Sequence, residues 1–111
     1  MKIENHQNFV VLEDEKDDII DFASFIESQI PSKYKGQNVV LNLLKYDSLD
    51  LPQVLQFLKT SNLHRKTKQS FVIVNDAIDI DEVPFEMIVV PTLQEAGDIV
   101  EMEEIERDLG F

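Results

Sequence analysis

The chain has no cysteine and no tryptophan, and it has only three glycines among its 111 residues. Without cysteine it can form neither a disulfide nor a thiolate metal site, so we expect a protein of the reducing cytoplasm. No apolar run approaches the roughly 20 residues that a membrane-spanning helix needs. The first 16 residues carry many charges around one short apolar run, which is typical of neither a signal peptide nor a membrane anchor.

Basic residues are scarce as well: 10 lysines and arginines stand against 22 acidic residues, for a net charge of -12. The imbalance is concentrated in residues 76–111, which hold 12 acidic residues and one base, Arg107. Residues 59–68 show the opposite bias, with four bases and no acid. An acidic surface repels phosphate backbones, so we expect no nucleic-acid partner. The acidity serves either solubility or the binding of a basic protein.

The length fits one domain with one core, and the apolar periodicity alternates between strand and helix. Short apolar runs predict strands at residues 2–7, 9–12, 38–44, 70–75 and 86–90. Helical spacing predicts a helix over residues 17–30 that ends at Pro31, a second from about residue 51, and a third opened by the capping sequence TLQE at residues 92–95. The predicted order is β-β-α-β-α-β-β-α. This order indicates an α/β fold with parallel β-α-β units.

The segment from Val39 to Leu58, VVLNLLKYDSLDLPQVLQFL, is the most informative part of the chain. A short apolar strand ends at Asn42. A turn with Asp47, Ser48 and Asp50 follows and leads into an amphipathic helix. This arrangement resembles the centre of a STAS domain, the fold of the anti-sigma factor antagonists.

In the STAS family, a strand similar to VVLDL is followed, eight residues after its Asp, by an Asp-Ser-Ser-Gly turn that opens a helix. Here Asn42 takes the place of the strand Asp, and Asp50 takes the place of the turn Asp. The phosphoacceptor serine of the family falls on Pro52, which has no hydroxyl. The resemblance implies a mixed β-sheet with helices mainly on one face. It also implies a protein-binding role in bacterial regulation that is not switched by phosphorylation at the usual position.

By this resemblance, the partner would be an anti-sigma factor kinase or a related switch protein. The binding surface would be the turn and the exposed side of the helix that follows it. Its predicted residues are Ser48, Asp50, Leu51, Pro52, Gln53, Gln56, Lys59 and Thr60. Ser48 is also a candidate for phosphorylation, since a phosphate is tolerated near a helix N-terminus, although Asp47 and Asp50 would repel it. The simpler interpretation is that Ser48 or Asp50 caps the helix and that Pro52 occupies its first turn.

The sequence contains no recognisable catalytic or metal-binding motif. It lacks G-x-S-x-G and a phosphate-binding loop. His6 and His64 are 58 residues apart, so they cannot build the histidine cluster of a metallo-β-lactamase-type nuclease such as ribonuclease Z. Four residues of one loop could supply oxygen ligands to a cation: Asp76, Asp79, Asp81 and Glu82. The glycine and the glutamate that complete a calcium loop are missing there, so we expect a non-catalytic protein with no metal and no cofactor.

His64 lies in the basic stretch LHRKTK, at the expected end of the second helix. Cations at this position complement the free carbonyl groups of a helix C-terminus. The stretch is therefore expected to be a solvated helix end, or alternatively a docking patch for an acidic partner.

The tail after Gly97 is strongly acidic and carries a narrow apolar stripe. We take residues 1–97 as the STAS-like domain and residues 98–111 as an acidic amphipathic C-terminal helix. The stripe consists of Ile99, Met102, Ile105 and Leu109, with Phe111 at its end. It either packs on the domain's own sheet or docks into a partner's groove or against a second copy of the chain. An accessory or assembly protein that acts through this helix is therefore the alternative function.

Overall fold

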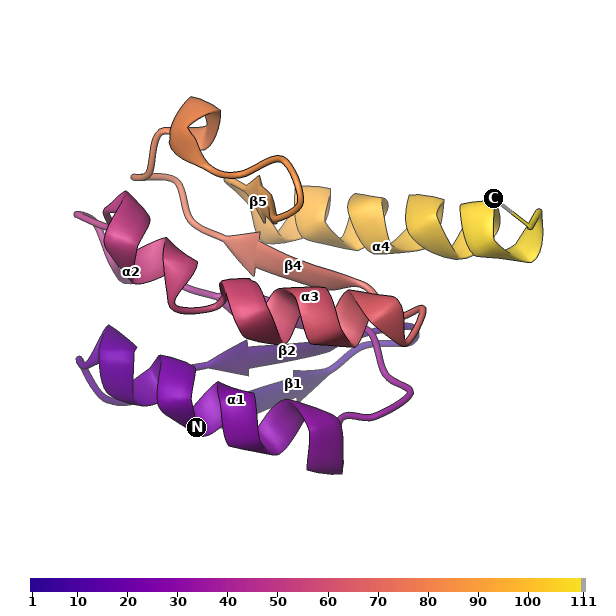
Figure 1. Cartoon of the computed structure of the whole chain (residues 1–111), viewed down its shortest axis with the longest axis horizontal. Coiled ribbons are helices and arrows are strands. Elements are labelled where there is room, and N and C mark those ends of the chain that lie inside the picture. Colours follow the sequence, from indigo (N-terminus) through magenta and orange to yellow (C-terminus); the bar gives the residue numbers. More distant parts are fainter. Residues whose placement is uncertain (111) are drawn as a thin grey trace.

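A five-stranded sheet lies between two unequal helical layers in the computed structural model, which describes residues 1–110 (Figure 1). The strands, side by side in this order, are β1 (Lys2–Asn5), β2 (Val10–Glu13), β3 (Val39–Asn42), β4 (Phe71–Val74) and β5 (Ile88–Val90). Strand β1 is antiparallel to β2, and the strands from β2 to β5 are parallel to one another. The predicted α/β class with a mixed sheet is therefore confirmed.

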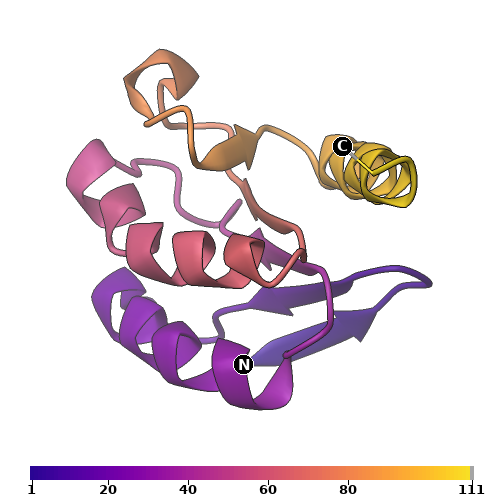
Figure 2. The ribbon, with the colours of Figure 1, turned by 45° about the vertical axis from the view of Figure 1, so that its right-hand side comes forward.

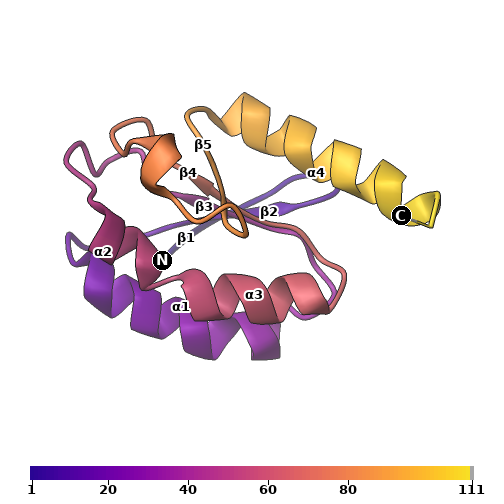
Figure 3. The same ribbon diagram turned by 45° about the horizontal axis from the view of Figure 1, so that its top comes forward.

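The two helical layers differ in size. Helices α1 (Ile19–Lys33), α2 (Leu51–Leu55) and α3 (Leu58–Lys66) cover one face of the sheet, and α1 and α3 lie side by side (Figure 3). Helix α4 (Leu93–Asp108) lies alone on the other face (Figure 2). A single 3-10 turn, η1 (Ile80–Glu82), interrupts the connection from β4 to β5. No helix within residues 1–110 is long and apolar enough to cross a membrane.

The central strands β2, β3 and β4 are buried on both faces, because helices cover both sides of the sheet. Their successive side chains alternate between two apolar clusters. The larger cluster, beneath α1, α2 and α3, combines strand residues such as Leu41 and Ile73 with Phe22, Ile26 and Phe57. The buried residues of the smaller cluster, beneath α4, are Val11, Val40, Val72, Val74, Ala96 and Val100.

Helix α1 forms as predicted but ends later than expected. Asp18 caps it by accepting a hydrogen bond from the Asp21 amide at 3.1 Å. The prediction that Pro31 ends the helix is wrong, because α1 continues to Lys33. Tyr34, which follows, is only 7% exposed. Its burial favours a further helical turn past an exposed proline, even though proline cannot donate the backbone hydrogen bond of that position.

The single helix predicted after β3 is divided into α2 and α3 at Gln56 and Phe57. There the backbone hydrogen bonds join residues three apart instead of four: the Phe57 amide donates to the Val54 carbonyl oxygen at 3.0 Å. The change turns the Phe57 side chain into the core, where it is fully buried and meets the Phe22 ring edge to face at 6.1 Å between centroids. Burial of this large ring accounts for the break.

Helix α4 runs without interruption from Leu93 to Asp108 and therefore passes through Gly97. Thr92 caps it by accepting a hydrogen bond from the Glu95 amide at 3.1 Å. The expected boundary between domain and tail at residue 97 lies inside this helix. The first turns of α4 thus attach the acidic C-terminal segment directly to the sheet.

Candidate partner-binding surfaces

The turn between β3 and α2 lies at the carboxyl ends of the parallel strands, the edge at which α/β proteins usually bind their ligands. Asn75, at the end of β4, is fully buried and holds this turn in place. Its side-chain amide donates to the carbonyl oxygens of Leu43 and Tyr46, both at 2.8 Å. Its oxygen accepts from the amides of Ala77 and Ile78, both at 2.9 Å. One side chain therefore joins the loops that follow β3 and β4, and the sequence alone did not single it out.

A second set of contacts joins the same turn to the end of β2. The Tyr46 hydroxyl donates to Asp14 Oδ2 at 2.7 Å, and Lys45 lies over the Tyr46 ring and 3.3 Å from Asp17. Burial, together with the hydrogen bond to the Asp14 carboxylate, raises the pKa of Tyr46 well above its ordinary value. Tyr46 therefore stays protonated and acts here as a structural donor.

The start of α2 is closed by a complete capping box. Asp50 Oδ1 accepts from the Gln53 amide at 3.0 Å, and Gln53 Oε1 accepts from the Asp50 amide at 3.0 Å. Capping by Asp50 is thus confirmed. Leu49 is buried just before the cap, so the turn is anchored from below while Ser48 and Pro52 remain exposed. The result is an ordered turn whose outer side is open to solvent.

The predicted partner-binding residues are only partly brought together on one surface. Seven of them are exposed or half-buried along the turn and the helix start, and we name them the turn surface: Ser48, Asp50, Leu51, Pro52, Gln53, Gln56 and Lys59. Thr60 was predicted to belong to this surface, but it is only 4% exposed and lies between α1 and α3. The α3 periodicity turns Thr60 inward, so it cannot contact a partner there. Lys59 forms an ion pair with Glu27 of α1 at 3.2 Å.

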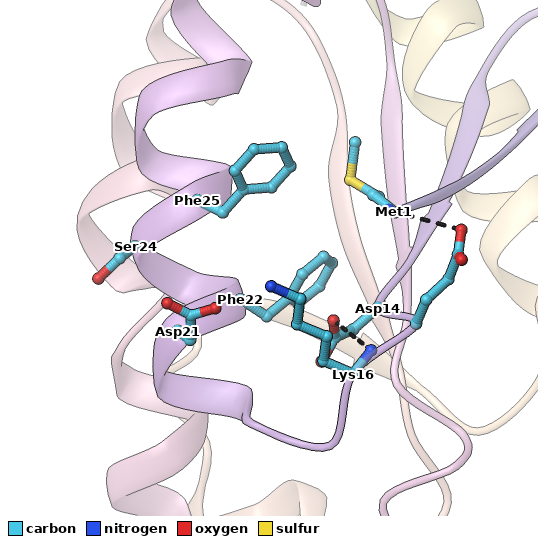
Figure 4. Close-up of a pocket in the computed structure, with 8 residues that line it drawn as sticks. Met1, Asp14, Lys16, Asp21, Phe22, Ser24 and Phe25 are labelled. Atoms are coloured by element: carbon cyan, nitrogen blue, oxygen red, sulfur yellow. Dashed lines mark hydrogen bonds and ion pairs between the residues drawn. The ribbon is translucent and has the colours of Figure 1, made fainter.

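A cavity of about 670 Å³ lies beside the carboxyl end of β2, between α1 and the N-terminal residue (Figure 4). Phe22 and Phe25 form its apolar wall, and Asp14, whose Oδ1 accepts from the Lys16 amide at 3.0 Å, lies on the charged side. Ser24 points away from these groups (Figure 4), so no serine–base pair forms here. Among residues 1–110, no group of three histidine or carboxylate side chains lies close enough to hold a metal ion.

The acidic loop after β4 uses its carboxylates for local structure. Asp79 caps η1 by accepting from the Asp81 amide at 3.0 Å. Ile78 before it is buried, and Val83 after it packs against the larger core cluster. The loop therefore folds back on its apolar residues, and its acidic side chains stay in solvent.

His64 does not lie at a solvated helix end, and that prediction is wrong for this residue. It is only 4% exposed, and its ring meets the ring of Phe71 edge to face. Its Nε2 lies 2.6 Å from the Gln37 carbonyl oxygen and must be the protonated nitrogen, because a carbonyl can only accept. Burial lowers the pKa of His64, and the hydrogen bond to Gln37 opposes that shift only in part. Lys66 and Lys68, farther along, are exposed as expected.

The face of α4 that meets the sheet carries a polar network that the sequence did not reveal. Glu103 accepts from Arg65 Nη2 at 2.7 Å and from the Ser70 hydroxyl at 2.6 Å. Arg107 donates to Asn38 Oδ1 at 3.2 Å and to the Ser70 hydroxyl at 3.3 Å. Burial alone would raise the pKa of Glu103, but the hydrogen bonds from Arg65 and Ser70 outweigh it and lower the pKa. The network fastens the second half of α4 to the amino ends of β3 and β4.

The apolar stripe of α4 consequently faces away from the sheet. Ile99 is half-buried against the smaller core cluster, whereas Met102, Ile105 and Leu109 are 48%, 54% and 66% exposed. The interpretation that the stripe packs on the domain's own sheet is therefore wrong for these three residues, which we name the outer stripe. Phe111, the last predicted docking residue, lies outside the described residues.

No protein-family model matches the chain, and no curated protein matches it either. What these surfaces can bind therefore follows from their geometry and charge. Of the residues predicted to bind a partner, those that the structure leaves accessible form two surfaces: the turn surface at the carboxyl edge of the sheet and the outer stripe of α4.

Proposed function

We propose that the protein is a STAS-like, non-catalytic regulatory module of the bacterial cytoplasm that binds a protein partner through the turn surface. The observation that supports this proposal is the turn itself. It is held from within by Asn75 and the Asp50 capping box, while Ser48, Pro52 and Gln56 face solvent. A surface that is ordered before binding loses little conformational entropy when a partner docks.

The partner in this proposal is an anti-sigma factor kinase or a related switch protein, as the resemblance of the central segment implies. Pro52 occupies the position of the family's phosphoacceptor serine, so binding would not be interrupted by phosphorylation there. Ser48 is exposed and remains a candidate for modification. A phosphate at Ser48 would stand beside the exposed carboxylates of Asp47 and Asp50, and the repulsion would weaken the turn.

The proposal is tested by capturing partners of the tagged chain from its native cytoplasm and titrating the purified partner against variants. Gln56→Arg is the informative substitution, because Gln56 is exposed and does not take part in the capping box, unlike Gln53. We expect it to weaken binding of a sigma-pathway partner at least tenfold. Gln7→Arg is the matched control, because Gln7 is also exposed but lies at the opposite edge of the sheet; it should not change the affinity for the partner. A partner that binds the Gln56→Arg variant normally would contradict the proposal.

A second function is favoured by one specific observation, the exposure of the outer stripe. Three large apolar side chains in a row on an acidic helix form a surface that an assembly protein would use to dock a partner. Deleting residues 98–111 would not test this function cleanly, because the deletion also removes the buried Val100 and the network of Glu103. Ile105→Glu keeps both and should abolish binding through the stripe while leaving binding through the turn surface intact.

A further inference from the structure

We propose that the outer stripe of α4 docks into a groove between α1 and α3 of a second copy of this chain. The inference rests on the second function above and leaves the turn surface free. It identifies the receiving surface, the partner and the symmetry of the contact.

The α1/α3 groove has a volume of about 340 Å³ and mostly apolar walls. Ile30 and Pro31 of α1 form one side, and Thr60 and Leu63 of α3 form the other. Leu63 is 53% exposed at the rim, so its side chain has room to close over an inserted apolar group. The groove therefore offers a receptor of the kind that accepts a row of aliphatic side chains from a helix.

Lysines lie along the groove and next to it. Lys35 lines the groove, Lys33 stands in the last turn of α1 two residues after Pro31, and Lys59 pairs with Glu27, another lining residue. Among residues 1–110, Lys33 and Lys35 form no ion pair, and both are exposed. In a chain of net charge -12, such a local excess of free cations attracts an acidic surface.

The outer stripe has the complementary chemistry. Acidic residues lie on both sides of it along α4, all exposed: Glu95, Asp98, Glu101, Glu106 and Asp108. Among the described residues none of the five is engaged in an ion pair. Met102, Ile105 and Leu109 would enter the groove while these carboxylates meet the lysines around it. An α4-to-α4 contact would instead bring the acids of two copies together, and the repulsion disfavours it.

The stripe and the groove lie on opposite sides of the sheet (Figure 2). Each copy therefore offers its stripe to one neighbour and its groove to another, and the contact is head-to-tail. Unless the rotation between copies closes a ring, such an interface continues beyond a dimer. The predicted assembly therefore grows with protein concentration and weakens at high salt, which screens the charged part of the contact.

Sedimentation velocity of the full chain tests this inference across a wide range of concentrations. We expect the mean mass to rise with concentration past that of a dimer. Ile105→Glu disrupts the stripe, and Leu63→Glu disrupts the groove. Each variant alone should stay monomeric at a concentration at least tenfold above that at which the parent chain associates. Mixed in equal amounts they should form a one-to-one dimer and nothing larger, because each supplies the surface that the other lacks. Ile20→Glu, on an exposed position of α1 away from the groove, should associate like the parent.

Circular dichroism melting of each variant establishes that it is folded; all three positions are at least half exposed. A parent chain that stays monomeric at every concentration would overturn the inference, as would two single variants whose mixture fails to restore a dimer. If the chain is monomeric yet a foreign protein still requires Ile105, self-association fails while the second function stands. If Gln56→Arg alone abolishes partner binding, the first function stands independently of both.

Discussion

On the face covered by α1, α2 and α3, 19 buried residues from two helices, four strands and the connecting segments form one apolar cluster. On the α4 face, the apolar cluster contains six buried residues. The smaller face is completed by hydrogen bonds and an ion pair around Glu103 and Arg107. Apolar packing depends on area and is tolerant of orientation, while hydrogen bonds demand one geometry. The comparison shows how a helix can be oriented by polar contacts that leave its larger apolar side chains in solvent.

The largest effect should come from the apolar face. Phe57→Ala empties a fully buried site against Phe22 and should lower the free energy of unfolding by about 3–5 kcal/mol. Val100→Ala, on the α4 face, removes only two methyl groups and should cost clearly less. Urea denaturation of both variants measures the difference. Equal losses would mean that the two faces contribute alike to the free energy of unfolding.

On the α4 face, the polar network around Glu103 should contribute more to stability than its small number of residues indicates. Glu103→Ala leaves Arg65 and the Ser70 hydroxyl without their acceptor and should cost about 1–3 kcal/mol. Glu106→Ala, at an exposed position one turn farther along α4, should change stability by about 0.5 kcal/mol or less. Hydrogen exchange should show faster exchange in α4 after residue 103 for the first variant only. Unchanged protection there would show that the network does not hold the helix.

The pH dependence of stability should differ between the two faces, because His64 lies on the face covered by α1, α2 and α3. Its pKa is lowered below the ordinary value of 6.5, so just below pH 6.5 the unfolded chain binds a proton that the folded protein does not bind. Stability contributed by the neutral ring is present above pH 6.5 and is lost as the pH falls through that value, with a slope of at most about 1.4 kcal/mol per pH unit for one proton. Urea denaturation at several pH values should show this slope in the parent and not in His64→Gln.

Glu103 contributes to the pH dependence of stability at lower pH. Its pKa is lowered from an ordinary value of 4.5, so its contribution is complete above that value and is lost as the pH falls below it. The two losses therefore occur in different pH windows, one for each face. A single window that disappears with the His64→Gln variant would contradict a role for Glu103.

The smallest effect, and a favourable one, is expected from Gly97→Ala. A methyl group at this position would lie 3.5 Å from the Phe9 ring, an ordinary contact distance. Alanine also lowers the entropic cost of forming a helix interior relative to glycine, so stability should rise by about 0.5–1 kcal/mol. Thermal unfolding measures this directly. A loss of stability would mean that the Phe9 ring does not accommodate the added methyl group.

Much of the fold could be predicted because it depends on local patterns. The apolar runs at β2, β3 and β4 and the spacing of Ile19, Phe22, Ile26 and Ile30 indicate strands and a helix without any knowledge of their neighbours. The cap at Asp50 is local for the same reason. The continuation of α1 past Pro31 was missed, since it depends on the burial of Tyr34 against distant residues.

The candidate surfaces were less predictable. Exposure of Ser48, Pro52 and Gln56 followed from the periodicity of one segment, but the burial of Thr60 depends on how closely α3 approaches α1. Asn75 carried no sequence signal, because an asparagine at the end of a strand is most often only a turn residue. Its role is visible only when the carbonyl groups of Leu43 and Tyr46 are brought next to it.

Local sequence patterns were enough to locate the strands, to indicate where α1, α2 and α4 begin and to show that the C-terminal third is acidic, because each of these depends on neighbours within a few residues. Which side of α4 meets the sheet depends on contacts between distant residues. Both sides of this helix carry apolar residues, and the sequence left open whether the stripe of Met102, Ile105 and Leu109 is the packed side. Arg65 and Ser70, more than 30 residues away, hold Glu103 instead. A charge that is buried must be paired, so this contact set the rotation of α4 and left the outer stripe free.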